Sequence, residues 1–141
     1  MAIMGKGKVE HYIDLLKMLA MHSSVKHKHA CAVLQNGKLC GVGINKYLPG
    51  KGIRVCLHSE IDAMAGVKTL KGKDLLVIRI SSSNTLRMSK PCSGCLKKIK
   101  SNGINKVYYS TNEQTIAVEN AADVVADYHC SMTQYRNRLR G

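Results

Sequence analysis

Two short motifs of this chain hold the residue types that bind a metal ion and move protons. The first is His58-Ser59-Glu60, and the second, further along the chain, is Pro91-Cys92-Ser93-Gly94-Cys95. Imidazole and thiolate are typical zinc ligands, and three protein ligands leave a fourth position for a water molecule. Structural zinc sites are normally closed by four protein ligands, so the set His58, Cys92 and Cys95 predicts a catalytic zinc site.

The spacing of these residues suits hydrolytic chemistry. Cys92 and Cys95 are three positions apart, so they share one face at the start of a predicted helix, where the thiolate form is favoured. Zinc bound by one imidazole and two thiolates forms a unit without net charge and lowers the pKa of a water molecule beside it. Glu60 is then placed to take a proton from that water and pass it to a substrate. The alternative is a structural zinc site, with Cys56 or His129 among its ligands.

The elements that must position these motifs follow from the hydrophobic pattern. Asn36-Gly37 predicts a type I′ turn between two short strands, and Pro91 and Asn102-Gly103 mark the start and end of the cysteine helix. Loops are expected over 45–57 and 81–90. The predicted order is helix 9–21, strands 30–34 and 38–44, helix 57–70, strand 74–80, helix 91–101, strands 106–110 and 115–119, and helix 121–139.

This order predicts an α/β fold, a three-layer α/β/α sandwich with a mixed five-stranded sheet. Only four residues separate Ser110 from the strand that begins at Thr115. A parallel crossover needs about a dozen residues or more, so these last two strands must pair antiparallel if they are neighbours.

The length and composition of the chain indicate which class of protein it belongs to. The chain has 141 residues, of which 45% are apolar, with no Phe or Trp, which predicts a single folded domain over 1–141. No apolar run approaches the length of a membrane span, and the first residues lack the features of a signal peptide. We therefore expect no membrane partner and an intracellular, cytoplasmic location.

The formal net charge is +13, spread over most of the chain. Such a charge attracts phosphate groups, whether on a nucleotide or on a nucleic acid, although a solvated basic surface would look the same. His27 and His29 flank Lys28 just before the first strand. We interpret them as surface histidines, with contact to a phosphate at the mouth of the site as the alternative.

The motifs and strands together resemble the cytidine/deoxycytidylate deaminase superfamily. The resemblance covers roughly residues 30–110 and includes ACAVLQNGKLCGVGIN, LHSEIDAM, SKPCSGC and KVYYS. It implies a cytidine deaminase-like fold with zinc as cofactor, held by His58, Cys92 and Cys95, and Glu60 as the catalytic proton shuttle. It also implies that Asn45, Ser59 and Pro91 form the substrate-binding residues.

Two features point to different branches of that superfamily. Small nucleoside deaminases usually carry Cys in place of His58, whereas deaminases of transfer RNA, single-stranded DNA and deoxycytidylate carry His. The His-type families usually have a parallel fifth strand after an extra helix, for which this chain has no room. Members often assemble, so a homo-oligomer is a further expectation.

The favoured function is hydrolytic removal of the exocyclic amine of a nucleobase, with release of ammonia. Cytosine in a nucleoside or nucleotide is the favoured substrate. The alternatives are an RNA or single-stranded DNA editing deaminase, which the charge favours, and a non-catalytic zinc-containing module that binds nucleic acid. Glu60 argues against the last, because a binding module does not need that carboxylate.

Overall fold

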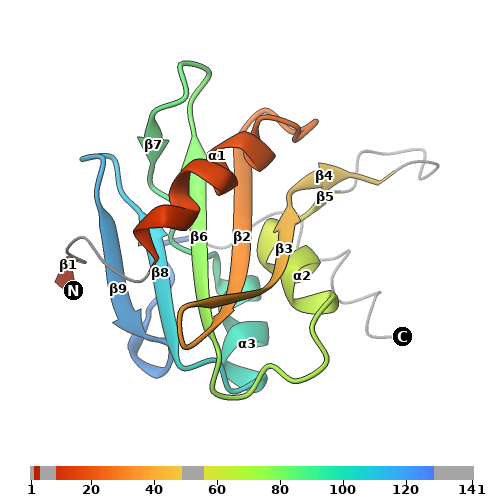
Figure 1. Cartoon of the computed structure of the whole chain (residues 1–141), viewed down its shortest axis with the longest axis vertical. Helices are drawn as coiled ribbons and strands as arrows, with labels where there is room; N and C mark the ends of the chain where they lie inside the picture. Colours follow the sequence, from red (N-terminus) through yellow and green to blue (C-terminus); the bar gives the residue numbers. More distant parts are fainter. Residues whose placement is uncertain (1, 4–8, 49–55, 129–141) are drawn as a thin grey trace.

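The fold is built on one mixed β-sheet (Figure 1). The computed structural model describes residues 2–3, 9–48 and 56–128. The sheet order is β1-β9-β8-β6-β2-β3, and β7 pairs with β6 beside this path. The strands are β1 (Ala2–Ile3), β2 (Lys28–Gln35), β3 (Lys38–Ile44), β6 (Asp74–Ile80), β7 (Leu86–Arg87), β8 (Lys106–Ser110) and β9 (Ile116–Asn120).

The five longer strands confirm the predicted mixed sheet. β6 and β8 run parallel, while β2 is antiparallel to both β3 and β6. β9 pairs antiparallel with β8, as the short connection between them requires. Asn36 and Gly37 both have positive φ, at 50° and 79°, which confirms the type I′ turn between β2 and β3.

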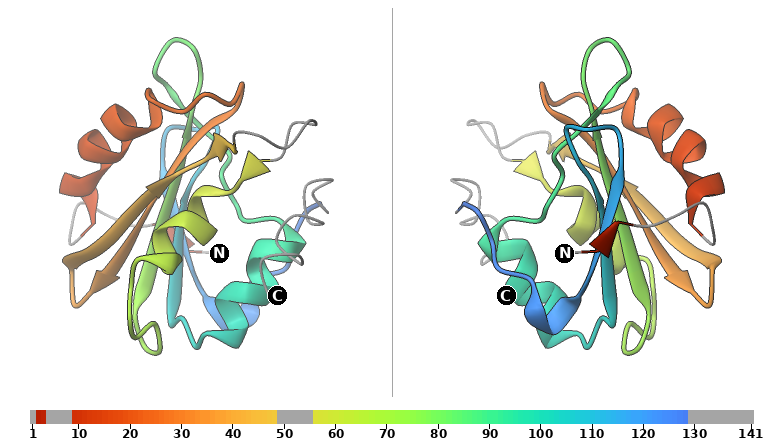
Figure 2. Two further views of the ribbon diagram at one scale, coloured as in Figure 1. Left: turned by 90° about the vertical axis from the view of Figure 1, so that its right-hand side faces the viewer. Right: turned by 90° about the vertical axis from the view of Figure 1, so that its left-hand side faces the viewer.

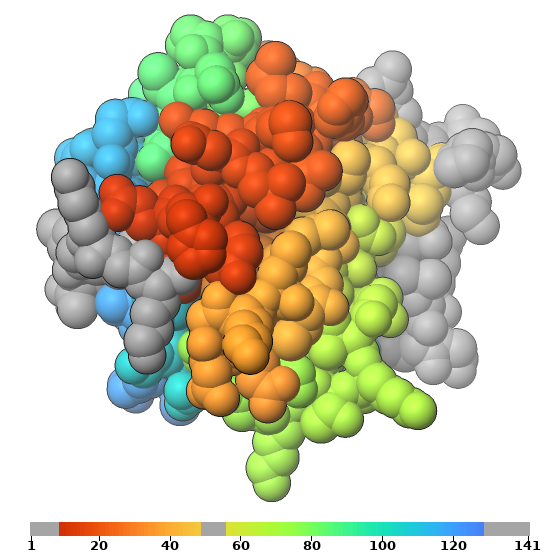
Figure 3. Space-filling view, in the orientation of Figure 1, coloured from red at the N-terminus to blue at the C-terminus, as the bar shows by residue number. Residues whose placement is uncertain are grey.

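Helices cover both faces of the sheet, which confirms the three layers (Figure 2). Helix α1 (Ile13–Ala20) lies on one face, preceded by a 3-10 turn at Glu10–Tyr12, and α2 (Ser59–Ala65) and α3 (Ser93–Ser101) lie on the other. Side chains of α1 and of the β2–β3 hairpin form the continuous red-to-gold surface of Figure 3. Each face has its own apolar core: Leu16 of α1 and Ile78 of β6 belong to one, and Val77 of β6 and Ile99 of α3 belong to the other.

Helix α2 packs unusually close to β3. A Cβ atom on Gly43 would lie 2.3 Å from the backbone nitrogen of Ala63 in α2, so only glycine fits there. The Asp62 carboxylate accepts a hydrogen bond from the Ile44 N–H at 3.1 Å, which ties the same helix to the end of β3. These contacts fix the start of α2 relative to the strand ends.

The two expected loops contain short strands. Residues 45–57 include β4 (Lys46–Tyr47) paired with β5 (Cys56–Leu57), and residues 81–90 include β7. Helix α2 is shorter than predicted and ends at Ala65, with Gly66 as its C-cap, while α3 begins at Ser93 rather than at Pro91. The N-cap of α3 is Cys92, so the proline lies just before the helix and not in its first turn.

The prediction of a long helix over 121–139 is wrong for residues 121–128, the part that the structure describes. A 3-10 turn, η2 (Ala121–Asp123), is followed by extended backbone at Val124, with ψ of 131°. Lys100 Nζ donates to the Val124 carbonyl at 2.8 Å, and the Ser93 N–H donates to the Tyr128 carbonyl at 3.1 Å. Contacts with α3 thus replace helical hydrogen bonds. The rest of the prediction, 129–139, lies outside the described residues.

The helices of the described residues were compared with the requirements of a membrane span. None of these helices combines the length and the apolar character that crossing a bilayer requires.

The contact at Gly43 generates a stability prediction. Gly43→Ala should lower the free energy of unfolding by about 1–3 kcal/mol or more, because the added methyl group meets helix backbone that cannot move aside. Gly66→Ala is the matched control, since its nearest atom is the Ala63 carbonyl oxygen at 3.9 Å and its φ is −85°. That variant should change stability by less than about 1 kcal/mol. Urea denaturation of both variants measures the change in the free energy of unfolding. Equal changes in the two variants would contradict the close packing at Gly43.

Candidate functional site

The predicted metal ligands sit where two helices begin. His58 is the N-cap of α2 and Cys92 is the N-cap of α3, each with extended backbone. Cys95 lies in the first turn of α3, on the same face as Cys92. Because α2 and α3 share one face of the sheet, their first residues meet.

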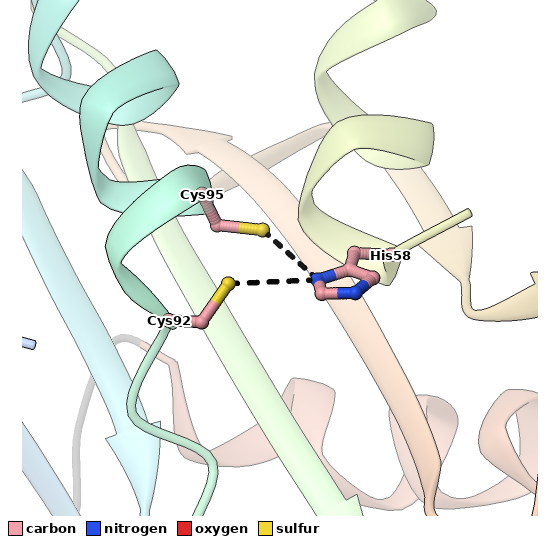
Figure 4. Close-up of side chains that lie close together, drawn as sticks. All are labelled: His58, Cys92 and Cys95. Atoms are coloured by element: carbon pink, nitrogen blue, oxygen red, sulfur yellow. Dashed lines mark hydrogen bonds between the residues drawn. The ribbon is translucent and has the colours of Figure 1, made fainter. Parts of the chain in front are cut away.

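The three side chains converge on one point (Figure 4). His58 Nδ1 lies 3.2 Å from Cys95 Sγ and 3.7 Å from Cys92 Sγ, and the three atoms all lie within 4.8 Å of one another. Tetrahedral zinc with ordinary bond lengths would place nitrogen and sulfur ligands about 3.5 Å apart. The atoms therefore fit a zinc ion bound through Nδ1 and two thiolates.

Two other candidate ligands from the sequence do not join this cluster. Cys56 lies nearby in β5, but among the described residues the metal-binding group holds only His58, Cys92 and Cys95. His129 lies outside the described residues. The geometry thus supplies three ligands from the described chain, the number that leaves a coordination position open.

Glu60 lies in the first turn of α2, two residues after His58, and is only 5% exposed. Burial raises the pKa of its carboxyl group, while the nearby His58 and hydrogen bonds from the backbone and Ser59 act in the opposite direction. The Ser59 hydroxyl donates to Glu60 Oε1 at 3.1 Å and so orients the carboxyl group. A carboxyl group with a raised pKa is suited to both accepting and donating protons.

A cavity of about 250 Å³ adjoins His58 and Glu60. It brings together residues from separate parts of the chain, including Asn45 at the end of β3 and Ser59 at the start of α2. Among the described residues, the wall consists of Val25, His27, His29, Asn45, Tyr47, Cys56, His58, Ser59, Glu60, Ser89, Lys90 and Tyr128.

Asn45 lines the cavity, and its side-chain amide also forms hydrogen bonds with the segment around the start of β2. Asn45 Oδ1 accepts hydrogen bonds from the Ser23 hydroxyl at 2.6 Å and from the His29 N–H at 2.9 Å. Asn45 Nδ2 donates to the His27 carbonyl at 2.6 Å. Its predicted contact with a substrate sugar stays a prediction, whereas its role in holding residues 27–29 is visible.

His27 and His29 both line the cavity. His27 is exposed, as the interpretation as a surface histidine expects, whereas His29 is half-buried. Burial lowers the pKa of His29 to about 4, with smaller effects from the charges of Arg79 and His58. His29 Nδ1 lies 3.0 Å from the His27 carbonyl, which can only accept a hydrogen bond. Nδ1 therefore carries the proton, and the neutral ring keeps Nε2 as an acceptor.

The segment before Cys92 is anchored to the sheet by serines. Ser89 Oγ donates to the Val77 carbonyl at 2.8 Å and accepts from the Ser110 N–H at 2.8 Å. Pro91 is fully buried and is not among the described residues that line the cavity, so its contact with substrate stays a prediction. Sequence reasoning missed Ser89, Lys90 and Tyr47, which carry no motif that would distinguish them.

The family model for the cytidine and deoxycytidylate deaminase zinc-binding region matches residues 7–111 of the chain. This match includes both motifs and all three residues of the metal cluster. None of the curated proteins gives a significant match.

Solved structures share the fold at low sequence identity. Cytidine deaminase from Burkholderia pseudomallei is 18% identical, with a TM-score of 0.64 over 89% of this chain and 99% of that one. The dCMP deaminase of cyanophage S-TIM5, solved with dCMP and dUMP, is 21% identical, with a TM-score of 0.57 over 75% of this chain and 82% of that one. RibD of Acinetobacter baumannii has a TM-score of 0.52 and 17% identity over 72% of this chain but 27% of its own length. With a family match over most of its length and three ligand atoms that fit zinc, the chain belongs to the zinc-binding cytidine and deoxycytidylate deaminase family.

Proposed function

We propose that this protein is a zinc-dependent hydrolase that converts a cytosine base, carried on a nucleoside or nucleotide, into uracil with release of ammonia. The observation that carries the proposal is the position of Glu60. A buried carboxyl group with a raised pKa lies in the wall of a cavity, two residues from a ligand of the metal cluster. Such a carboxyl group can move protons beside a hydrolytic metal site.

The size of the cavity supports a small substrate. About 250 Å³ lies near the lower end of small-molecule sites, which span roughly 300–1,000 Å³. One base and its sugar suit this space better than a large ligand. Asn45 and Ser59 lie in the wall, so polar groups are available to orient the sugar and the base.

The proposed reaction adds water to the ring carbon that bears the amine and then breaks the carbon–nitrogen bond. His58, Cys92 and Cys95 would hold the zinc ion, which would supply Lewis-acid chemistry beside the water. Glu60 accepts one proton from the water and passes it to the ring nitrogen. It then accepts the second proton, from the hydroxyl group on the ring carbon, and passes it to the departing amine. Water and the amino base are consumed, and the carbonyl base and ammonia are formed. Ser59 holds the Glu60 carboxyl group in position through its 3.1 Å hydrogen bond.

Two other functions account for the site less well. A non-catalytic zinc module would leave the burial of Glu60 beside the metal cluster unexplained, because burying a carboxyl group is costly. An RNA or DNA editing deaminase would use the same chemistry and remains the main competitor on the basis of the +13 charge. Both alternatives are outcomes of the activity test.

The activity test measures ammonia release by the zinc-loaded protein. Substrates are cytidine, deoxycytidine, their monophosphates, adenosine, guanosine, and short single-stranded RNA and DNA. We expect turnover of a cytosine monomer, which Glu60→Gln should reduce by about 10²–10⁴-fold or more while zinc content is unchanged. Asp62→Asn is the matched control, since it removes the same charge from the same helix but leaves an oxygen that can accept from Ile44 N–H. It should retain activity within a few-fold.

The possible results separate the alternatives. Turnover of oligonucleotides alone would replace the proposal with an editing function. Zinc binding without any turnover would favour a binding module. Activity of Glu60→Gln close to that of the unaltered protein would remove Glu60 from the mechanism.

Metal binding gives an independent prediction. Loss of a residue that only hydrogen-bonds to a metal ligand costs about 10–100-fold in metal affinity. Cys92→Ser changes a ligand itself and should therefore weaken zinc binding by at least about 100-fold. Cys56→Ser is the control, because Cys56 lies in the cavity wall but outside the cluster. Titration with Co²⁺, followed through thiolate-to-metal absorption, makes the measurement. Equal losses in the two variants would mean that Cys56 belongs to the ligand set.

A further inference from the structure

Arg79 is a charged residue in the most buried strand of the sheet. Its neighbours Leu75, Leu76, Val77 and Ile78 are fully buried in β6. Arg79 pairs across the sheet with His29, two residues along the strand from Val77, so its side chain projects on the face that carries the metal cluster. A guanidinium group in this position requires a physical explanation.

The positive charge of Arg79 is not paired with a side-chain carboxylate. All nine Asp and Glu residues of the chain lie in the described part, and the ion pairs there are Lys46–Asp62 and Lys90–Asp127. Arg79 Nε is buried and has no hydrogen-bond partner among the residues that the structure describes. Partly buried guanidinium groups are usually paired, so the arrangement has the features of a site for an anion.

The partner of Arg79 is a histidine in the cavity wall. Arg79 Nη2 lies 2.8 Å from His27 Nδ1. Because a guanidinium group can only donate, Nδ1 must accept, and the proton of the neutral imidazole must lie on Nε2. Burial lowers the pKa of His27, and the charges of Arg79 and Lys26 lower it further, so the ring is neutral at neutral pH. The pair therefore offers N–H donors and positive charge without a remaining acceptor.

His27 lies where the cavity meets solvent, and Arg79 adjoins the cavity through its contact with His27. His27 is an exposed residue that also lines the cavity, and the Asn45 amide holds its backbone carbonyl at 2.6 Å. The same Asn45 amide accepts from the His29 N–H, so the donor pair is fixed relative to the sugar-binding position predicted for Asn45. An anion bound by Arg79 and His27 would thus lie beside Asn45 in the cavity wall.

We propose that Arg79 and His27 bind the phosphate monoester of the substrate, so that the enzyme acts on nucleoside monophosphates in preference to nucleosides. This inference rests on the proposed deaminase function. It adds that the enzyme distinguishes nucleoside monophosphates from nucleosides. A phosphate monoester offers several acceptor oxygens and up to two negative charges, which match a planar fork of guanidinium donors. A phosphodiester within a polynucleotide carries less charge and has no free end to enter the mouth of the cavity.

The test compares two arginines that face each other across the sheet edge. Arg79 and Arg87 are cross-strand partners in β6 and β7, and Arg87 is exposed. We expect Arg79→Gln to lower kcat/KM for the monophosphate by about 10–100-fold, the usual worth of a charged hydrogen bond, and to leave the nucleoside unchanged. Arg87→Gln removes the same charge nearby and should change neither value more than a few-fold. His27→Ala, at an exposed position, should give a smaller loss with the same selectivity for the monophosphate.

Equilibrium binding keeps this inference separable from the proposed chemistry. Calorimetry with UMP, AMP and GMP against their nucleosides needs no turnover, so the phosphate preference can be measured even if no ammonia is released. The expected result is tighter binding of monophosphates that disappears in Arg79→Gln. Equal affinity for nucleoside and monophosphate, equal losses in Arg79→Gln and Arg87→Gln, or tighter binding of an oligonucleotide without a terminal phosphate would each overturn the inference.

Discussion

The close contact between α2 and β3 at Gly43 is the constraint on which the site depends. The glycine lets the helix backbone approach the strand, and the Asp62 carboxylate fixes the same helix to the Ile44 N–H. The first residues of α2 are thereby held beside the end of β3. His58, Glu60 and Asn45 consequently surround one cavity, although Asn45 and His58 belong to separate elements.

The second half of the site depends on hydrogen bonds to two central strands. Ser89 joins the Val77 carbonyl of β6 to the Ser110 N–H of β8, and this holds the segment that leads into Cys92. The metal cluster then links α2 to α3 across one face of the sheet. A metal ion bound there would stabilise the fold as well as activate water, because it connects two independently anchored helices.

The sequence predicted the parts of the site in which local chemistry and position coincide. Helix starts carry both metal-binding motifs, the Asn36-Gly37 turn fixes the hairpin, and the short link before β9 enforces antiparallel pairing. These features depend on residue type and spacing within a few positions, so they could be read without a three-dimensional structure.

The remaining features depend on contacts between distant segments. The predicted helix after β9 fails because α3 takes the Val124 and Tyr128 carbonyls as partners, which local periodicity does not reveal. His29 looked like a surface residue, but the Asn45 network draws it into the cavity wall. Arg79 had one local signal, a charge directly after four apolar residues of β6, yet its contact with His27 joins residues 52 positions apart.

The central claim is that the cavity catalyses hydrolysis at the carbon bearing an exocyclic amine. The most direct measurement is mass spectrometry of the product formed by the zinc-loaded protein in ¹⁸O-labelled water. The account predicts a carbonyl base that carries one ¹⁸O atom for each ammonia released. Ammonia formed without ¹⁸O in the base would contradict hydrolytic deamination.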